Sequence, residues 1–209
     1  LELSISGQNI WFQLIGLFNA YNILTAYSVA MILGEDAQEI LIQLSQCRST
    51  RGRFEYVGNE RNIMAIVDYA HTPDALNNVL STIDNLRTKN EQLITVIGCG
   101  GNRDQEKRPK MASIATSYSD KVILTSDNPR FESPDEILDD MMNGVSPVYH
   151  KRVMRVVDRR EAIRVACNLA NKRDVILVAG KGHEDYQEVQ GEKVHFDDKK
   201  ILIQMLNKI

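Results

Sequence analysis

The stretch LITVIGCGGNRD at residues 93–104 decides the fold, because a short apolar run leads directly into a glycine-rich loop. The run is rich in β-branched residues and lacks polar alternation, which is typical of a strand buried on both faces of a sheet. Lys107–Pro109 then open a helix. Similar apolar runs occur at residues 64–67, 122–124 and 175–179, and we expect each to be a strand of the same sheet.

Amphipathic helices are predicted between these strands, because apolar residues recur three and four positions apart. The segments are 76–86, 111–118, 137–145, 158–170 and 201–206. Alternation of strands and helices predicts βαβ units, and hence an α/β fold with a Rossmann-like, mainly parallel sheet and helices on both faces. Tyr186–Phe196, with Gln190-Gly191 at its centre, predicts a small hairpin.

The first fifty residues have a different organisation. A strand is predicted at Ile10–Ile15, followed by helices at Phe18–Leu33 and Asp36–Cys47. The polar, basic segment Arg48–Arg53 predicts a linker, which divides the chain into domains at 1–52 and 53–209. So short a first part can hardly bury a core by itself. Because the chain also starts without methionine, we expect it to be the tail of a preceding domain.

Composition excludes several classes of protein. The 209 residues are 43% hydrophobic and 25% charged, with a formal net charge of -3, which gives no electrostatic support for coating nucleic acid. No stretch approaches the ~18 to 20 apolar residues of a membrane span, and no signal peptide is evident. The three cysteines have no metal-ligand spacing, and their odd number argues against a disulfide framework. We expect a soluble, cytoplasmic protein without nucleic-acid or membrane partners.

Ligands of open parallel sheets bind beyond the carboxyl ends of the strands, so the loops there are the candidate sites. Asp68 and His71 follow the first strand; a helix start capped by Thr72-Pro73 does not account for them. In the 98–109 loop, glycines would let backbone amides approach an anion. Basic side chains beside them favour a phosphate or carboxylate ligand: Arg103, Lys107 and Arg108.

Two further loops carry charged side chains. Asp127-Asn128-Pro129-Arg130 predicts a stiff turn, and the planar guanidinium of Arg130 suits bidentate capture of a carboxylate. Gly180–Glu184 lacks the spacing of a phosphate-binding P-loop, and its lone His183 is more often structural than catalytic. Glu184 is suited to an ammonium group. The residues alone therefore predict a small anionic or zwitterionic ligand at the carboxyl edge.

Five segments, in this order and spacing, resemble the Mur ligases, ATP-dependent amide-forming enzymes of cytoplasmic peptidoglycan precursor synthesis. They are 52–55, 67–73, 98–109, 127–130 and 180–184. The resemblance covers essentially the whole chain and is greatest to members that add meso-diaminopimelate to UDP-MurNAc-L-Ala-D-Glu through an acyl phosphate. It implies that residues 1–52 are the tail of the central ATP-binding domain and that 53–209 form the C-terminal amino-acid-binding domain.

The resemblance also implies roles for individual residues. Asn19 and Asn22 would lie against adenine, Arg53 would offset phosphate charge, and Asp68 would face the ribose with His71 nearby. No covalent nucleophile is expected. Diaminopimelate has a distal carboxylate that lysine lacks, and the guanidinium of Arg130 has paired N–H donors that can bind it. The diaminopimelate pocket would comprise Arg103, Asp127, Asn128, Pro129, Arg130, Gly180 and Glu184.

ATP and Mg²⁺ are the implied cofactors, and the UDP-MurNAc-dipeptide and meso-diaminopimelate are the implied partners. The magnesium ligands and the P-loop would lie upstream, so this chain would hold no metal and be inactive alone; we expect a monomer. Gln105-Glu106 departs from the Lys-Gly frequent in the family, which leaves the loop conformation open. Two alternatives are a lysine-adding ligase and a non-catalytic module that binds an amino acid or a nucleotide.

Overall fold

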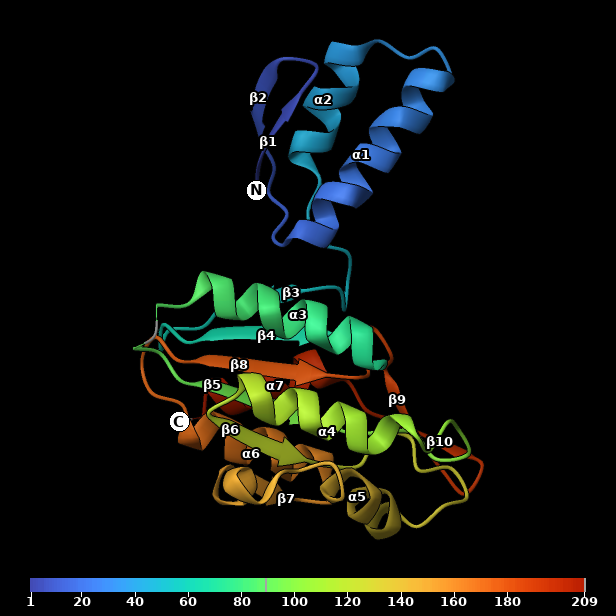
Figure 1. Ribbon diagram of the computed structural model, residues 1–209, viewed down its shortest axis with the longest axis vertical. Helices are drawn as coiled ribbons and strands as arrows, with labels where there is room; N and C mark the ends of the chain where they lie inside the picture. The colour runs from blue at the N-terminus through green and yellow to red at the C-terminus, as the bar shows by residue number, and fades with distance from the viewer. Residues whose placement is uncertain (89, 209) are drawn as a thin grey trace. The chain divides into compact units, whose positions relative to one another are not determined.

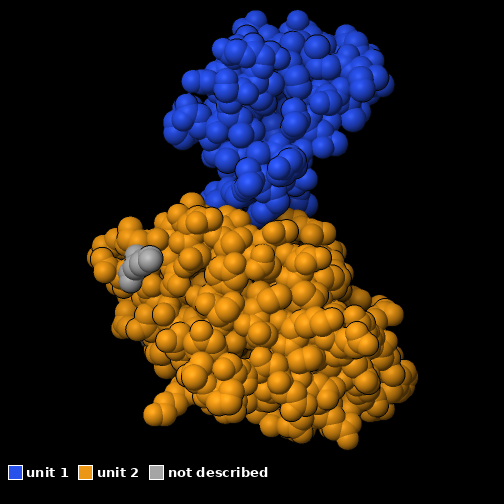
Figure 2. Space-filling view, viewed as in Figure 1, with its two compact units in different colours: residues 1–50 blue, residues 51–209 orange. Residues whose placement is uncertain are grey.

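The computed structural model describes residues 1–88 and 90–208, and the chain divides into two compact units, residues 1–50 and 51–209 (Figure 2). Residue 209, the last of the expected second domain, lies outside the described residues. Among the helices that the structure describes, none is long and apolar enough to cross a membrane.

Unit 1, residues 1–50, contains a hairpin and two helices. Strands β1 (Glu2–Ile5) and β2 (Gln8–Trp11) pair antiparallel around Ser6-Gly7, both of which have positive φ. Helices α1 (Leu17–Ile32) and α2 (Ala37–Gln46) follow. The strand predicted at Ile10–Ile15 is present two residues earlier and ends sooner, at Gln8–Trp11, because the Ser6-Gly7 turn sets the register of the hairpin. The two predicted helices are present, with slightly different ends.

One face of α1 helps to form the small core of unit 1. The buried side chains of this core are Ile5, Phe12, Ile23, Tyr27, Ile40 and Leu41. Other apolar residues of α1 are exposed, including Leu17 at 68% and Tyr21 at 67%. Unit 1 therefore has both a core and an apolar helix surface that this core does not cover.

Unit 2, residues 51–209, is built on a six-stranded sheet of order β3-β4-β8-β5-β6-β7 (Figure 1). All neighbours are parallel except β3 and β4. The mainly parallel sheet predicted from the sequence is confirmed. The strand bounds are β3 Glu55–Val57, β4 Met64–Asp68, β5 Leu93–Ile97, β6 Lys121–Leu124, β7 Val153–Arg155 and β8 Val175–Ala179. The edge strands β3 and β7 were not predicted, because three-residue strands lack the long apolar run of a buried strand.

Helices cover both faces of this sheet (Figure 1). Helix α3 (Pro73–Leu86) packs on α4 (Lys107–Tyr118), which packs on α5 (Pro134–Met142). On the other face α6 (Arg159–Leu169) packs on α7 (Asp198–Leu206). The 3₁₀ helix η1 (Pro147–Arg152) precedes β7. The predicted terminal hairpin is present as β9 (Tyr186–Val189) and β10 (Glu192–His195).

Candidate functional site

Glycines join two loops at the carboxyl edge of the sheet of unit 2. A Cβ added to Gly98 would lie 2.4 Å from the carbonyl oxygen of Thr125, and one added to Gly101 would lie 2.0 Å from that of Pro129. The amide of Gly101 donates to the carbonyl oxygen of Asn128 at 2.9 Å. These two glycines therefore allow close backbone packing between loops, and the Gly101 amide is engaged within the protein rather than presented to an anion.

Two of the three basic residues beside the glycines are engaged within the protein. Arg108 is almost fully buried and pairs with Glu132 at 2.7 Å and Asp140 at 2.8 Å. Lys107 donates to the carbonyl oxygen of His71 at 2.9 Å. Their predicted contribution to anion binding is therefore not supported, whereas Arg103 is exposed on its loop.

Gln105-Glu106, which stands where the family often has Lys-Gly, forms part of the turn that leads into α4. The carboxylate of Asp104 accepts from the amide of Glu106 at 2.9 Å, and the amide of Arg108 donates to the carbonyl oxygen of Gln105 at 3.0 Å. The loop therefore closes onto the helix without the glycine that the family often has here.

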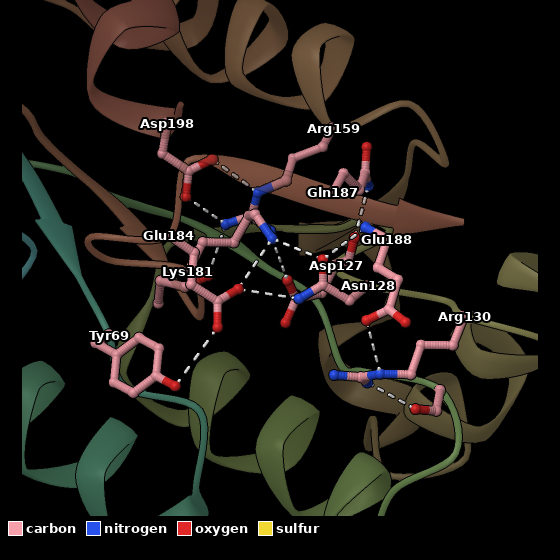
Figure 3. Close-up of polar contacts among 12 residues, drawn as sticks. Tyr69, Asp127, Asn128, Arg130, Arg159, Lys181, Glu184, Gln187, Glu188 and Asp198 are labelled. Carbon is pink, nitrogen blue, oxygen red and sulfur yellow. Dashed lines mark hydrogen bonds and ion pairs between the residues drawn. The ribbon is translucent and has the colours of Figure 1, made fainter. Parts of the chain in front are cut away.

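A buried lysine connects the loops at 125–130 and 180–185 (Figure 3). The fully buried Nζ of Lys181 lies 3.2 Å from a carboxylate oxygen of Asp127, 2.9 Å from Oδ1 of Asn128 and 3.2 Å from a carboxylate oxygen of Glu184. Asn128 also donates to Glu184 at 2.9 Å. One ammonium thus offsets two carboxylates of the predicted pocket.

Sequence reasoning missed Lys181. Its position between two glycines, directly after a strand buried on both faces, was the available indication. A lysine there can only extend over the sheet edge, where burial requires acidic partners.

Arg130 lies beside the same cluster, in a left-handed conformation with φ of 52°. Its Nε lies 3.2 Å from a carboxylate oxygen of Glu188, and its Nη1 donates to the carbonyl oxygen of Gly101 at 2.8 Å (Figure 3). A Cβ added to Gly100 would lie 3.0 Å from Arg130 Nη1 and 3.8 Å from Arg103 Cγ, so the two arginines flank one glycine.

The predicted amino-acid pocket is therefore brought together. Gly180 joins it, because an added Cβ would lie 3.6 Å from a carboxylate oxygen of Asp127. Three loops contribute the seven residues: Arg103, Asp127, Asn128, Pro129, Arg130, Gly180 and Glu184.

Two predicted residues, Arg53 and His71, lie around Tyr69 together with His183. The guanidinium carbon of Arg53 lies 5.1 Å from the centre of the Tyr69 ring, an arrangement typical of a cation–π contact. The rings of His71 and His183 lie 4.6 Å and 4.9 Å from it. The Tyr69 hydroxyl approaches Glu184 at 3.5 Å, and burial together with Glu184 raises the pKa of this tyrosine. Tyr69 thus links Arg53 to Glu184 of the predicted pocket, a role that the sequence did not indicate.

Asp68 holds the backbone of the neighbouring segments. Its two carboxylate oxygens accept from the amides of Phe54 at 2.6 Å and Ala70 at 2.7 Å, and burial raises its pKa. Phe54 has a φ of 45°, so this carboxylate stabilises an unusual backbone conformation immediately after Arg53. Asp68 therefore positions the backbone at residues 54 and 70, and its contact with a ribose stays a prediction.

Asn19 and Asn22 belong to unit 1, whereas the other predicted site residues belong to unit 2. Asn19 donates to the carbonyl oxygen of Ile15 at 2.7 Å, and Asn22 donates to Asn19 at 3.2 Å. The two asparagines therefore form one polar group on the first turns of α1.

Neither a metal centre nor a reactive thiol is built from the described residues of unit 2. In the part of the chain that the structure describes, no three His, Cys, Asp or Glu side chains are grouped to hold a metal ion. Burial raises the pKa of the Cys99 and Cys167 thiols to about 12, so neither is an activated nucleophile.

A parallel sheet with charged loops beyond its carboxyl ends defines an α/β ligand-binding domain of the Rossmann-like class. Residues 52–182, more than half of the chain, match the family model described as Mur ligase, glutamate ligase domain. The chain therefore belongs to the Mur ligase family.

Curated relatives and a solved structure agree with this family. A UDP-N-acetylmuramoyl-L-alanyl-D-glutamate–2,6-diaminopimelate ligase from Cytophaga hutchinsonii is 56% identical over 209 residues, which are 100% of this chain and 43% of that protein. A ligase of the same name from Parabacteroides distasonis is 53% identical over 96% of this chain and 41% of its own length. A solved structure with that name is 37% identical, with a TM-score of 0.73, and is matched over 99% of this chain and 42% of that one. The chain thus spans about two fifths of the length of the relatives it matches.

Proposed function

We propose that the chain is the C-terminal part of an ATP-dependent amide ligase that adds meso-diaminopimelate to UDP-MurNAc-L-Ala-D-Glu in the cytoplasm. One observation carries the proposal: Lys181 gathers Asp127, Asn128 and Glu184 beside Arg130. This cluster offers carboxylates for an ammonium group and a guanidinium for a carboxylate, the two charges at the distal end of diaminopimelate. The names of the curated relatives support the same substrates.

The proposed contribution of this chain to the reaction is positional. The D-glutamate carboxylate would be activated as an acyl phosphate, the diaminopimelate amine would attack its carbon, and phosphate would leave. Arg130 and Arg103 would hold the distal carboxylate and Glu184 the distal ammonium, so that the reacting amine is oriented in a site with little water. Arg53 would offset phosphate charge from its place beside Tyr69.

We propose that unit 1 is the end of the central ATP-binding domain, with Asn19 and Asn22 facing adenine. The exposed apolar face of α1 supports this, since Leu17 and Tyr21 are suited to packing against further chain. The described residues contain no group of three His, Cys, Asp or Glu side chains that could hold a metal ion. We therefore propose that the Mg²⁺ ligands belong to the upstream part of the whole enzyme.

Substitution of Arg130 by lysine in the full-length ligase tests the pocket. We expect the KM for meso-diaminopimelate to rise roughly tenfold or more, because an ammonium cannot replace a planar fork of donors. Steady-state kinetics with varied diaminopimelate measure this, and Arg164→Lys, an exposed change on α6, is the matched control. An unchanged KM would remove Arg130 from the pocket.

Two further experiments discriminate between the remaining candidate functions, one on the full-length enzyme and one on the 209-residue chain. Competition between lysine and diaminopimelate decides which amino acid is added. Calorimetry on the 209-residue chain addresses the binding module: tight ATP binding by this chain alone would favour the module over the ligase fragment.

A further inference from the structure

The hairpin β9–β10 is bonded to the turn that carries Arg130. Gln187 donates to the carbonyl oxygen of Asp127 at 2.6 Å, and the amide of Glu188 donates to Oδ1 of Asn128 at 3.0 Å. The amide of Arg130 donates to the carbonyl oxygen of Glu188 at 3.0 Å, and its own carbonyl oxygen accepts from Gln190 at 2.8 Å. Strand β9 therefore fixes the position of the turn.

These bonds hold Arg130 in a backbone conformation that non-glycine residues rarely adopt, with φ of 52°. Backbone hydrogen bonds with residues 188 and 190, at the amide and the carbonyl oxygen of Arg130, offset the energetic cost of this conformation. The direction in which the arginine side chain leaves the turn therefore depends on β9.

Glu188 also contacts the side chain of Arg130. Its carboxylate lies at Nε, while the carbonyl oxygen of Gly101 accepts from Nη1, so two acceptors on different edges fix the plane of the guanidinium (Figure 3). The two side chains are only 18% and 22% exposed, which limits screening by solvent. The guanidinium is thus oriented before a ligand arrives.

We infer that Glu188 is a positioning residue that sets amino-acid selectivity by orienting the guanidinium of Arg130 toward the distal carboxylate. The inference rests on the proposed function, in which Arg130 holds that carboxylate. Preorganisation lowers the cost of immobilising a flexible side chain on binding. Without Glu188, the Arg130 side chain would lose its conformational freedom only when diaminopimelate binds, and the affinity would be lower.

Kinetics of the full-length ligase test the inference. We expect Glu188→Ala to raise the KM for meso-diaminopimelate roughly twofold to tenfold, with little change in kcat. Glu188→Gln retains an acceptor for Nε and should restore most of the affinity. Lysine has no distal carboxylate, so any KM for lysine should not change. Glu192→Gln, an exposed substitution on β10, is the control on the same hairpin.

The outcomes separate this inference from the proposed function. An equal loss of kcat with both amino acids, with a lower melting temperature, would indicate a merely structural role and overturn the inference. An unchanged or lower KM for diaminopimelate in Glu188→Ala would do the same. If the wild-type enzyme has no diaminopimelate-dependent turnover, the proposed function fails and the inference with it.

Discussion

At the scale of a single residue, the buried charge of Arg108 is placed between two carboxylates. Its guanidinium bonds Glu132 and Asp140, and so ties α4 to the segments before and within α5. Glu132 in turn accepts from the amide of Asn102 in the glycine-rich loop. Arg108, which the sequence suggested as a ligand for an anion, thus stabilises the glycine-rich loop through Glu132.

Stability should depend on the protonation of Glu132. The amide of Asn102, together with Arg108, holds the pKa of this carboxyl below its ordinary value of 4.5. Because the folded-state pKa is the lower one, the stabilisation is present above pH 4.5 and is lost as pH falls through the folded-state value. We expect Glu132→Gln to be less stable than the wild type near neutral pH, with a difference that shrinks in acid.

Urea unfolding of the 209-residue chain at several pH values measures this difference. Glu136→Gln, an exposed position on α5, is the control and should show no such trend. A difference that stays constant from neutral to acid pH would contradict the role of the Glu132 carboxylate.

At the scale of elements, a buried ion pair connects the two helices on one face of the sheet. Arg159, at the start of α6, bonds Asp198, at the start of α7, through Nε at 2.8 Å and Nη2 at 2.7 Å. Both side chains are 0% exposed, and Nη2 also donates to the carbonyl oxygen of Ala179 at 2.9 Å. The pair therefore fixes both helices to the end of β8, from which the pocket loop leaves.

Removing one partner of this pair should be costly. We expect Asp198→Ala to lower the free energy of unfolding by about 3–5 kcal/mol, because it leaves a buried guanidinium without its counter-ion. The double variant Arg159→Met/Asp198→Leu should lose less than the single one. Chemical denaturation measures both, with Glu161→Ala in an exposed pair as a control expected to lose about 0–1 kcal/mol. A double variant less stable than Asp198→Ala would contradict this account.

At the scale of the whole molecule, the chain is two compact units joined at residues 50 and 51. No lysine or arginine precedes Arg48, and residues 47–54 form neither helix nor strand. We expect brief trypsin digestion to cut first after Arg48 and to leave a persistent fragment that contains unit 2, because Arg51 is paired with Asp197. Mass spectrometry identifies the cut, and fragments that begin within the sheet at the earliest times would contradict two separately folded units.

The sequence predicted the sheet, most helices and the charged loops at its carboxyl edge, because buried strands and charged loop residues leave a local pattern. It did not predict the partners of those residues. Lys181, Tyr69 and Glu188 act through contacts with residues distant in the sequence, and a single sequence does not encode such pairs visibly. The same limit explains Arg108, whose acidic partners lie in a later segment.

Gly52 lies against the backbone of Gly182 and His183, and a Cβ at residue 52 would fall 2.1 Å from the nitrogen of His183. Gly182 is also confined, since its added Cβ would lie 2.6 Å from Cβ of Tyr69 and 2.7 Å from the carbonyl oxygen of Gly52. Chimeric enzymes that exchange this domain between ligases must therefore transfer residues 51–55 and 180–184 from one parent. A crossover placed at residue 53 would combine two parents at this close backbone contact.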